Sequence, residues 1–130
     1  MAEEVGIDYV ATNLDFSKRE HRSPEFLKIN PNGKAPAMTD GDFTLFESGA
    51  IVTYLGDKTG KLVPEPKTNE RATYNQWMLF VMSELEQPLW TIGKSRFALP
   101  EEYRVPEIEK TAIYEFSRAC QVFDVGLGIE

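Results

Sequence analysis

The chain of 130 residues is long enough for one domain, or for one small domain with part of a second. Fourteen basic and twenty-one acidic residues give a net charge of −7, which repels nucleic acid and anionic membrane surfaces. No segment approaches the roughly 18 consecutive apolar residues of a membrane-spanning helix, and the acidic N-terminal segment is not a secretory signal. Because Cys120 is the single cysteine, an internal disulfide is excluded, and we expect a cytoplasmic protein without nucleic-acid or membrane partners.

The N-terminal half predicts a mixture of helices and strands. Residues 1–6 predict the end of a helix that stops at Gly6. The alternation of apolar and polar residues over 8–15 predicts a strand. After a polar loop, Ser23 as N-cap and Pro24 as the first helical residue predict a short helix.

A hairpin and a second helix follow. The short apolar runs at residues 35–38 and 43–46 are joined by an Asp-Gly-Asp sequence, and Asp-Gly between apolar runs is the strongest short hairpin signal. From Ser48 the pattern predicts a helix with one apolar face, which ends just before Gly60.

The sequence predicts a domain boundary after this helix. Residues 62–68 contain two prolines among polar residues, which is typical of a linker. We therefore predict a mixed α/β domain over residues 1–61, the linker at 62–68, and an all-helical domain over 69–130.

Two long helices are predicted beyond the linker. The first carries apolar side chains at helical spacing, namely Tyr74, Trp77, Met78, Val81, Met82 and Leu85. Pro88 is expected to kink or end it, because a proline inside a helix costs about 3 kcal/mol. The second follows Pro106, and its predicted apolar stripe consists of Ile108, Ala112, Ile113, Phe116, Cys120 and Phe123.

The Glu47-Ser48 pair at the start of the predicted helix has two interpretations. Serine is a preferred N-cap residue, and this structural role alone stabilises a helix by about 1 kcal/mol. A helix N-terminus is also an anion site, because its free N–H groups and its dipole favour a carboxylate. With the carboxylate of Glu47 beside it, the pair can hold a group that carries both charges, such as the α-amino-acid end of a peptide.

The Ala35-Pro36 step has a similar ambiguity. Only about 5% of X-Pro bonds are cis, so composition alone does not predict a cis bond here. A cis bond at this position would turn the backbone of Ala35 outward. Its N–H and C=O would then be open to a ligand, as at the edge of a sheet.

The segment SPEFLKINPNGKAPAMTDGDFTLFESGAIVTYL resembles the N-terminal, thioredoxin-like domain of the cytosolic glutathione transferases. The specific motifs are N-P-x-G-K-x-P and E-S-x-A-I-x-x-Y-L. The linker and the helical continuation resemble part of the all-helical second domain of the same family. The resemblance implies an α/β domain followed by an all-α domain, and a protein that conjugates the glutathione thiolate to small electrophiles, with glutathione as co-substrate and no metal.

The resemblance also implies a role for individual residues. Pro36 would be a cis-proline, and the backbone of Ala35 would pair with the cysteinyl part of glutathione. Glu47 and Ser48 would hold its γ-glutamyl end, and Lys34 would lie near its glycyl end.

The run HRSPEFLKIN is similar to the theta class in particular, in which a histidine at the place of His21 meets the glycine carboxylate. Family members are usually homodimers, which we expect here by analogy.

The chain departs from the family pattern at both ends. Family chains begin with a strand and a loop that carries a catalytic Ser, Tyr or Cys, whereas residues 1–9 resemble the end of the helix that follows. The strand expected at 8–15 would then lack its central partner, and the activating residue is unknown, although Thr12 and Ser17 carry hydroxyls. We interpret the chain as truncated at both ends, with a strand supplied by a neighbour as the other possibility.

The alternative functions are a module that binds glutathione or a protein without catalysis, as in the gamma subunits of elongation factors, and an inactive fragment.

Overall fold

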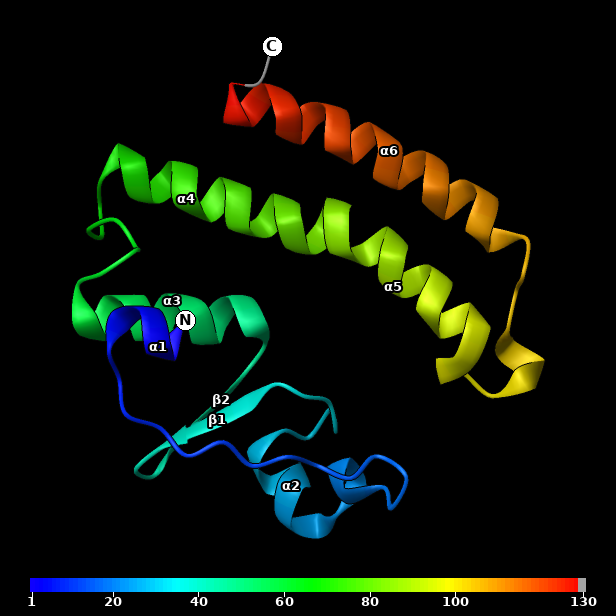
Figure 1. The fold of residues 1–130 in the computed structure, drawn as a ribbon, viewed down its shortest axis with the longest axis horizontal. Coiled ribbons are helices and arrows are strands. Elements are labelled where there is room, and N and C mark those ends of the chain that lie inside the picture. Colours follow the sequence, from blue (N-terminus) through cyan, green and yellow to red (C-terminus); the bar gives the residue numbers. More distant parts are fainter. Residues whose placement is uncertain (129–130) are drawn as a thin grey trace. The chain divides into compact units, whose positions relative to one another are not determined.

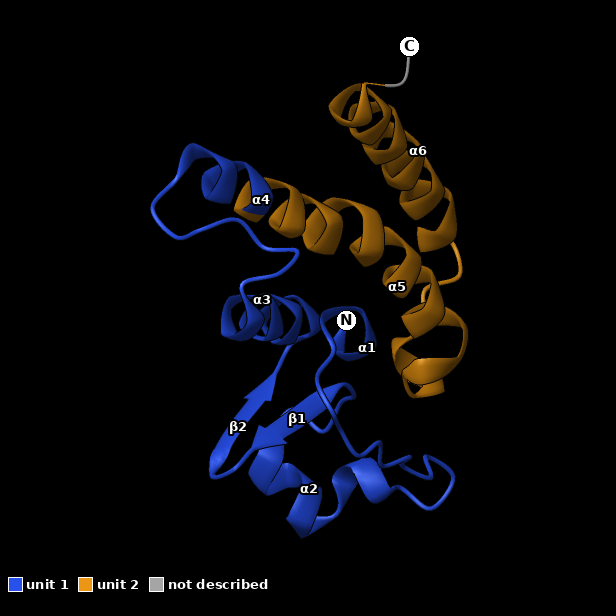
Figure 2. Ribbon diagram, turned by 60° about the vertical axis from the view of Figure 1, so that its left-hand side comes forward, with its two compact units in different colours: residues 1–74 blue, residues 75–130 orange. Residues whose placement is uncertain are grey.

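The computed structural model describes residues 1–128 and divides into two compact units, unit 1 (residues 1–74) and unit 2 (from residue 75) (Figure 2). Unit 1 contains, in chain order, α1 (Ala2–Val5), a 3₁₀ turn (Glu20–Arg22), α2 (Pro24–Ile29), β1 (Ala37–Asp40), β2 (Phe43–Phe46) and α3 (Ser48–Thr59) (Figure 1). The rest of the chain contains α4 (Asn69–Phe80), a π-helical segment (Val81–Glu86), α5 (Gln87–Gly93), a second π-helical segment (Lys94–Ala98), a 3₁₀ turn (Glu101–Tyr103) and α6 (Ile108–Leu127). This order confirms the predicted change from mixed α and β structure to helices alone. Each helix within residues 1–128 is too short or too polar to cross a membrane.

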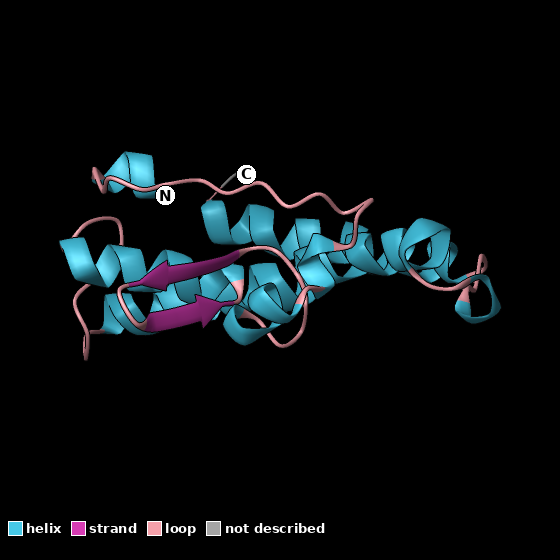
Figure 3. Ribbon diagram, turned by 90° about the horizontal axis from the view of Figure 1, so that it is seen from below, coloured by secondary structure: helices cyan, strands magenta, loops and turns pink. Residues whose placement is uncertain are grey.

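The strand predicted at residues 8–15 is wrong. Within residues 1–128 the sheet has two strands, β1 and β2, and residues 7–15 run as a loop (Figure 3). A strand needs a neighbouring backbone with which to pair, and β1 pairs with β2 alone. The predicted face, Tyr9, Ala11 and Asn13, is exposed, and so is Val10 on the other face, so the alternation that predicted a strand has no buried face.

The predicted hairpin is confirmed. β1 and β2 are antiparallel, with Ala37 opposite Phe46 and Asp40 opposite Phe43. The two residues between the strands include Gly41, whose φ of 59° is a conformation that glycine adopts readily. This register places the residues just before Ala37 and those just after Phe46 at the same open end of the hairpin.

The predicted start of α2 and the predicted stops of α1 and α3 are also confirmed. The Ser23 side chain accepts a hydrogen bond from the Phe26 N–H at 3.2 Å, and Pro24 is the first helical residue. α1 and α3 each stop at a glycine in the left-handed region, Gly6 with φ 79° and Gly60 with φ 65°. Local capping signals therefore set these boundaries.

The first turns of α4 belong to unit 1, because two side chains tie them to α3. Nη2 of Arg71 lies 2.6 Å from both carboxylate oxygens of Asp57. The Tyr74 hydroxyl lies 3.0 Å from Oγ1 of Thr53. The division between the compact units thus falls inside a helix, and the domain boundaries at the 62–68 linker stay a prediction.

The helix that contains Pro88 does not end there. The chain stays helical through Pro88 as far as Ala98, with the π-helical segment Val81–Glu86 directly before α5. A π-helical turn shifts each N–H to a carbonyl five residues back, which changes the partners of the carbonyls next to the proline. The proline therefore coincides with a widened turn rather than a break.

The apolar stripe predicted on α6 is correct in part. Ala112 is 1% exposed and lies on the buried face, whereas Ile113 is 54% exposed and its assignment to that face is wrong. Adjacent helical residues point about 100° apart, so both cannot lie at the centre of one narrow stripe. Ala119, which is 6% exposed, completes the buried face and was missed because alanine gives a weak apolar signal.

Trp77 is packed against the aromatic side chains of unit 2. Its ring meets Phe80 and Phe123 edge-on, with ring centroids 5.4 and 5.7 Å apart. A Cβ at Gly126 would collide with the same ring. The missing side chain at Gly126 therefore lets α6 approach Trp77 closely.

Candidate functional site

The candidate site begins where β2 passes into α3. Glu47 is the N-cap of α3 with φ 71° and ψ 117°, and Ser48 is the first helical residue. The interpretation of Ser48 as the N-cap is therefore wrong by one position, because Glu47 already takes the non-helical conformation. Glu47 is exposed and Ser48 is half-buried. A non-glycine residue with such a positive φ carries strain of about 1–3 kcal/mol, a feature that is concentrated at functional sites.

The loop before β1 holds three of the predicted residues. Lys34, Ala35 and Pro36 are all exposed, and the Ala35–Pro36 peptide is cis, as the resemblance implies. Since this loop enters β1 opposite the end of β2, the hairpin register brings Ala35 and Pro36 to the same end of the sheet as the start of α3.

The buried side chain that shapes this loop is Asn30, which the sequence reasoning missed. Asn30 is 2% exposed, its Nδ2 donates to the carbonyl of Lys34 at 2.6 Å, and its Oδ1 accepts from the N–H of Asn32 at 3.0 Å. The backbone carbonyl of Asn30 also accepts from the N–H of Gly33 at 2.9 Å. The first position of the N-P-x-G-K-x-P motif was the signal that could have identified Asn30.

The same loop packs against the 3₁₀ turn that carries His21. A Cβ at Gly33 would lie 2.9 Å from the His21 carbonyl oxygen and 2.7 Å from Nη1 of Arg22, and the φ of Gly33 is 62°. Nη1 of Arg22 donates to the carbonyl of Asn32 at 3.2 Å. Glycine is thus required here by close approach, and the contact holds the His21 segment beside the Lys34 loop.

His21 is half-buried and its ring stacks on Phe16, with centroids 4.7 Å apart and an interplanar angle of 26°. Its Nδ1 is covered and has no hydrogen-bond partner among the described residues. A ligand would therefore have to reach the Nε2 side of the ring.

Charged side chains at the other end of the hairpin form a separate cluster. The Lys58 ammonium pairs with Oδ2 of Asp40, and the Tyr54 hydroxyl donates to the same oxygen at 2.6 Å. Both contacts hold the pKa of Asp40 below its usual value, and the hydrogen bond from Lys58 has a larger effect than that from Tyr54. This cluster ties the hairpin to α3 and includes none of the predicted site residues.

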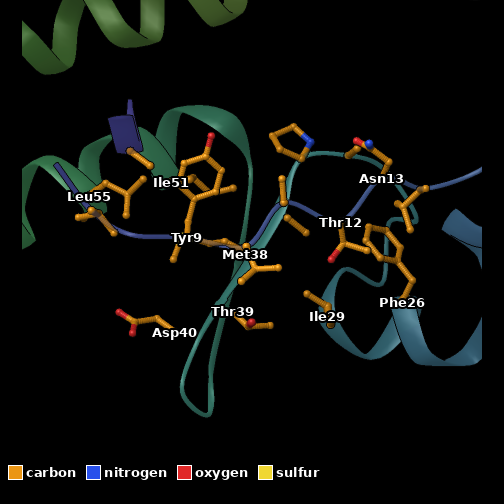
Figure 4. A pocket seen from close by; sticks show the side chains of 18 of the residues that line it. Tyr9, Thr12, Asn13, Phe26, Ile29, Met38, Thr39, Asp40, Ile51 and Leu55 are labelled. Carbon is orange, nitrogen blue, oxygen red and sulfur yellow. The ribbon is translucent and has the colours of Figure 1, made fainter. Parts of the chain in front are cut away.

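A large cavity lies inside unit 1, between the loop at residues 7–14 and β1 (Figure 4). Its volume is about 1020 Å³, and apolar side chains such as Phe26, Ile29, Ile51 and Leu55 line it. Ala35 and Pro36 border it, whereas Lys34, His21, Glu47 and Ser48 do not.

The N-terminal part of the chain matches a known domain family. Residues 1–57 match the family model for the glutathione S-transferase N-terminal domain, a range that includes all six predicted site residues. A glutathione S-transferase of Arabidopsis thaliana is 38% identical over 125 residues, which cover 94% of this chain and 58% of the relative. Residues 1–57 belong to the glutathione S-transferase N-terminal domain family.

Solved structures of this family have the same fold. A glutathione transferase of Phanerochaete chrysosporium in complex with oxidised glutathione has a TM-score of 0.83 and 37% identity, over 98% of this chain and 60% of that one. One from Pseudomonas fluorescens, with two glutathione molecules bound, has a TM-score of 0.85 and 32% identity, over 98% of this chain and 58% of that one. Unit 1 is accordingly a thioredoxin-like domain with a two-stranded sheet, and the chain spans about 60% of the length of such family members.

The two hydroxyls considered for activation of the glutathione thiol differ in their surroundings. Oγ of Ser17 donates to Oδ1 of Asp15 at 2.6 Å, so its proton is already engaged. Thr12 lines the cavity of unit 1. Neither observation identifies a catalytic group. The single thiol of the chain, Cys120, lies half-buried on α6.

Proposed function

We propose that unit 1 binds glutathione at the open end of its hairpin. The observation that carries this proposal is the match of residues 1–57 to the glutathione S-transferase N-terminal domain, together with the strained Glu47 at the exposed start of α3. Structural relatives that align over almost the whole chain contain glutathione or its disulfide, which supports the same ligand class here.

Each part of the tripeptide has a chemically suitable partner in this proposal. The carboxylate of the γ-glutamyl group meets the N–H groups and the dipole of α3 at Ser48, and its ammonium pairs with Glu47. The backbone of Ala35, turned outward before Pro36, pairs with the cysteinyl residue.

The remaining end of glutathione carries the glycine carboxylate. Lys34 and His21 are the cationic and polar groups that this proposal assigns to it, and the contact through Gly33 holds their two segments side by side. The theta-like role of His21 is part of this proposal.

The test is a titration of the 130-residue chain with reduced glutathione, followed by NMR or calorimetry. We expect Glu47→Ala and Ser48→Ala each to weaken binding about tenfold or more, because each removes a hydrogen bond to a charged group. Asp42→Ala and Ser83→Ala are the matched controls, since they remove the same kinds of group from exposed positions elsewhere. Parent-like affinity in both site variants would contradict the proposal.

We also propose that the protein carries out the reaction of the glutathione transferases. The glutathione thiolate attacks an electrophilic carbon of a small molecule, in a cytoplasmic homodimer with a role in detoxification. A free thiol with a pKa near 8.5 is only a few per cent ionised at neutral pH, so this reaction needs a hydrogen-bond donor at the sulfur.

A second candidate function is binding without catalysis, either of glutathione or of a protein. One observation favours it for this chain, namely that the hydroxyl of Ser17 is already committed to Asp15. A conjugation assay with a chlorinated nitroaromatic distinguishes the two. Glutathione binding without turnover supports the binding module, and turnover that Thr12→Val abolishes supports the enzyme.

A further inference from the structure

The loop before β1 places an asparagine directly before a glycine, at Asn32 and Gly33. Asn32 is exposed, whereas Gly33 is buried. Asparagine is chemically unstable on heating, because the backbone nitrogen of the next residue can attack its side-chain carbonyl carbon. A side chain on that next residue hinders the attack, so a glycine there leaves the asparagine least protected.

The packing of unit 1 requires this glycine. A Cβ at Gly33 would lie 2.7 Å from Nη1 of Arg22 and 2.9 Å from the His21 carbonyl oxygen, and the positive φ of Gly33 also disfavours a side chain. These contacts exclude the larger residues that would shield Asn32. The close approach of the loop to the 3₁₀ turn at residues 20–22 therefore makes a chemically unstable pair unavoidable.

The folded loop restrains the same pair. The Gly33 N–H, whose nitrogen must attack, donates to the carbonyl of Asn30 at 2.9 Å. The N–H of Asn32 donates to Oδ1 of Asn30 at 3.0 Å, and its carbonyl accepts from Nη1 of Arg22 at 3.2 Å. The peptide groups on both sides of Asn32 are thus fixed, and the attack requires a local opening in which the loop leaves the 3₁₀ turn.

We propose that Asn32 is a site of spontaneous deamidation that reacts when the loop at residues 30–34 detaches from the 3₁₀ turn. The Gly33 nitrogen gives up its proton and forms a bond to Cγ of Asn32, and the side-chain nitrogen leaves with that proton as ammonia. Water then opens the cyclic imide at one of its two carbonyl groups. The product is aspartate or isoaspartate at this position, and either form carries a new negative charge.

Isoaspartate alters the loop as well as its charge. In this form the main chain runs through the former side chain, which adds one backbone carbon after the Cα of residue 32. The two hydrogen bonds of the Asn30 side chain, to the N–H of Asn32 and to the carbonyl of Lys34, span this point. Both bonds cannot keep their geometry, so the reaction loosens the loop that leads to Ala35.

The site is tested by mass spectrometry of the 130-residue chain after incubation at mildly alkaline pH. The tryptic peptide Ile-Asn-Pro-Asn-Gly-Lys contains both Asn30 and Asn32. Asn30 is an internal control, because the nitrogen of Pro31 has no proton to lose. Asn13 is exposed but precedes a leucine, and it controls for exposure. We expect conversion at Asn32 and intact amides at the other two, and equal conversion at any two of them would overturn the inference.

The role of the fold is tested by the rate of conversion in the folded and the denatured chain. Two hydrogen bonds to Asn30 restrain the reacting stretch. The folded chain should therefore react about tenfold to a hundredfold more slowly than the chain in guanidinium chloride. Equal rates, or protection of more than about a thousandfold, would overturn the inference.

Arg22→Ala makes the test specific for the contact with the 3₁₀ turn. It removes the bond to the Asn32 carbonyl, so the folded variant should react about fivefold faster than the folded parent. The denatured variant and parent should react equally, because Arg22 lies ten residues away along the chain. Arg118→Ala removes the same charge from an exposed position on α6 and should follow the parent. An unchanged rate in folded Arg22→Ala, or an equal acceleration in Arg118→Ala, would overturn the inference.

Discussion

Asn30 is the residue on which the shape of the candidate site depends most directly. Its side chain is buried and bonds to the backbone on both sides of the turn that leads to Lys34 and Ala35. Both bonds are to backbone atoms and not to the side chains assigned to glutathione, so Asn30 is a positioning residue.

We predict that Asn30→Ala lowers the free energy of unfolding by about 3 kcal/mol, because two buried backbone groups lose their partners. Chemical denaturation measures this loss. Asn30→Asp keeps the acceptor for the Asn32 N–H but places a buried carboxylate oxygen against the Lys34 carbonyl, so at pH 7 it should destabilise the fold at least as much as alanine does. A loss below about 0.5 kcal/mol for Asn30→Ala would contradict the assigned role.

Asp40 makes the stability of unit 1 depend on pH. Its pKa in the folded chain lies below the usual value because Lys58 and then Tyr54 stabilise the carboxylate. A carboxyl group with a lowered folded pKa stabilises the fold above its unfolded pKa, near 4, and loses this contribution as the pH falls through the folded value.

We therefore expect Asp40→Asn to unfold at a lower temperature than the parent at pH 7, with a difference that shrinks below about pH 4. Thermal unfolding followed by circular dichroism over this pH range measures the effect. Asp42→Asn removes the same charge at a neighbouring position without these two contacts, and it should follow the parent. A difference that stays constant from pH 7 to acid would rule out the proposed linkage.

At the scale of elements, α6 approaches the ring of Trp77 so closely at Gly126 that an added Cβ would collide with the ring. We predict that Gly126→Ala lowers the free energy of unfolding by about 2 kcal/mol, because the added methyl group overpacks an aromatic contact.

The matched control is Gly93→Ala at the end of α5. There the nearest atom to an added Cβ is Cζ of Phe97 at 3.3 Å, at the end of a side chain that can move. Helix propensity then favours alanine by up to about 1 kcal/mol, so this variant should be as stable as the parent or more so. Equal effects of the two substitutions in denaturation experiments would show that the ring of Trp77 does not limit the approach of α6.

Elements with strong local signals could be predicted from sequence, and those that depend on a distant partner could not. The cap of α2 at Ser23 and the glycine stops of α1 and α3 act within a few residues. The segment 8–15 has the alternation of a strand, but pairing decides whether a strand forms, and alternation contains no information about the neighbour. The continuation of the helix through Pro88 likewise depends on a π-helical turn that no residue type marks.

Most residues of the candidate site were predicted from the family motifs and not from physical arguments about the sequence. The position of Glu47 and Ser48 at a helix start follows from the local pattern, although the cap is shifted by one residue. Asn30 and Gly33 act by burial and close approach, which become visible only when the loop and the 3₁₀ turn are placed together.

At the scale of the whole molecule, the described chain has a small core. The buried apolar side chains within residues 1–128 are those of Val5, Pro88, Ala112 and Ala119. Unit 1 has a two-stranded sheet beside a large, mainly apolar cavity. A two-stranded sheet has marginal stability unless more strands or helices cover it.

We therefore predict a broad, weakly cooperative thermal transition for the 130-residue chain and strong binding of a hydrophobic dye at neutral pH. Differential scanning calorimetry measures the width through the ratio of calorimetric to van't Hoff enthalpy. A single sharp transition in the chain alone would show that unit 1 needs no further strand.

The two units differ in their tryptophan content, which makes them distinguishable by fluorescence. Both tryptophans of the chain, Trp77 and Trp90, belong to unit 2, whereas the Tyr54 ring lies in unit 1 next to Phe43. Intrinsic indole emission is therefore a built-in optical probe of the helical unit alone. If unit 1 melts first, far-ultraviolet ellipticity will fall before the emission maximum shifts, and the two melting curves together will resolve the order of unfolding without any label.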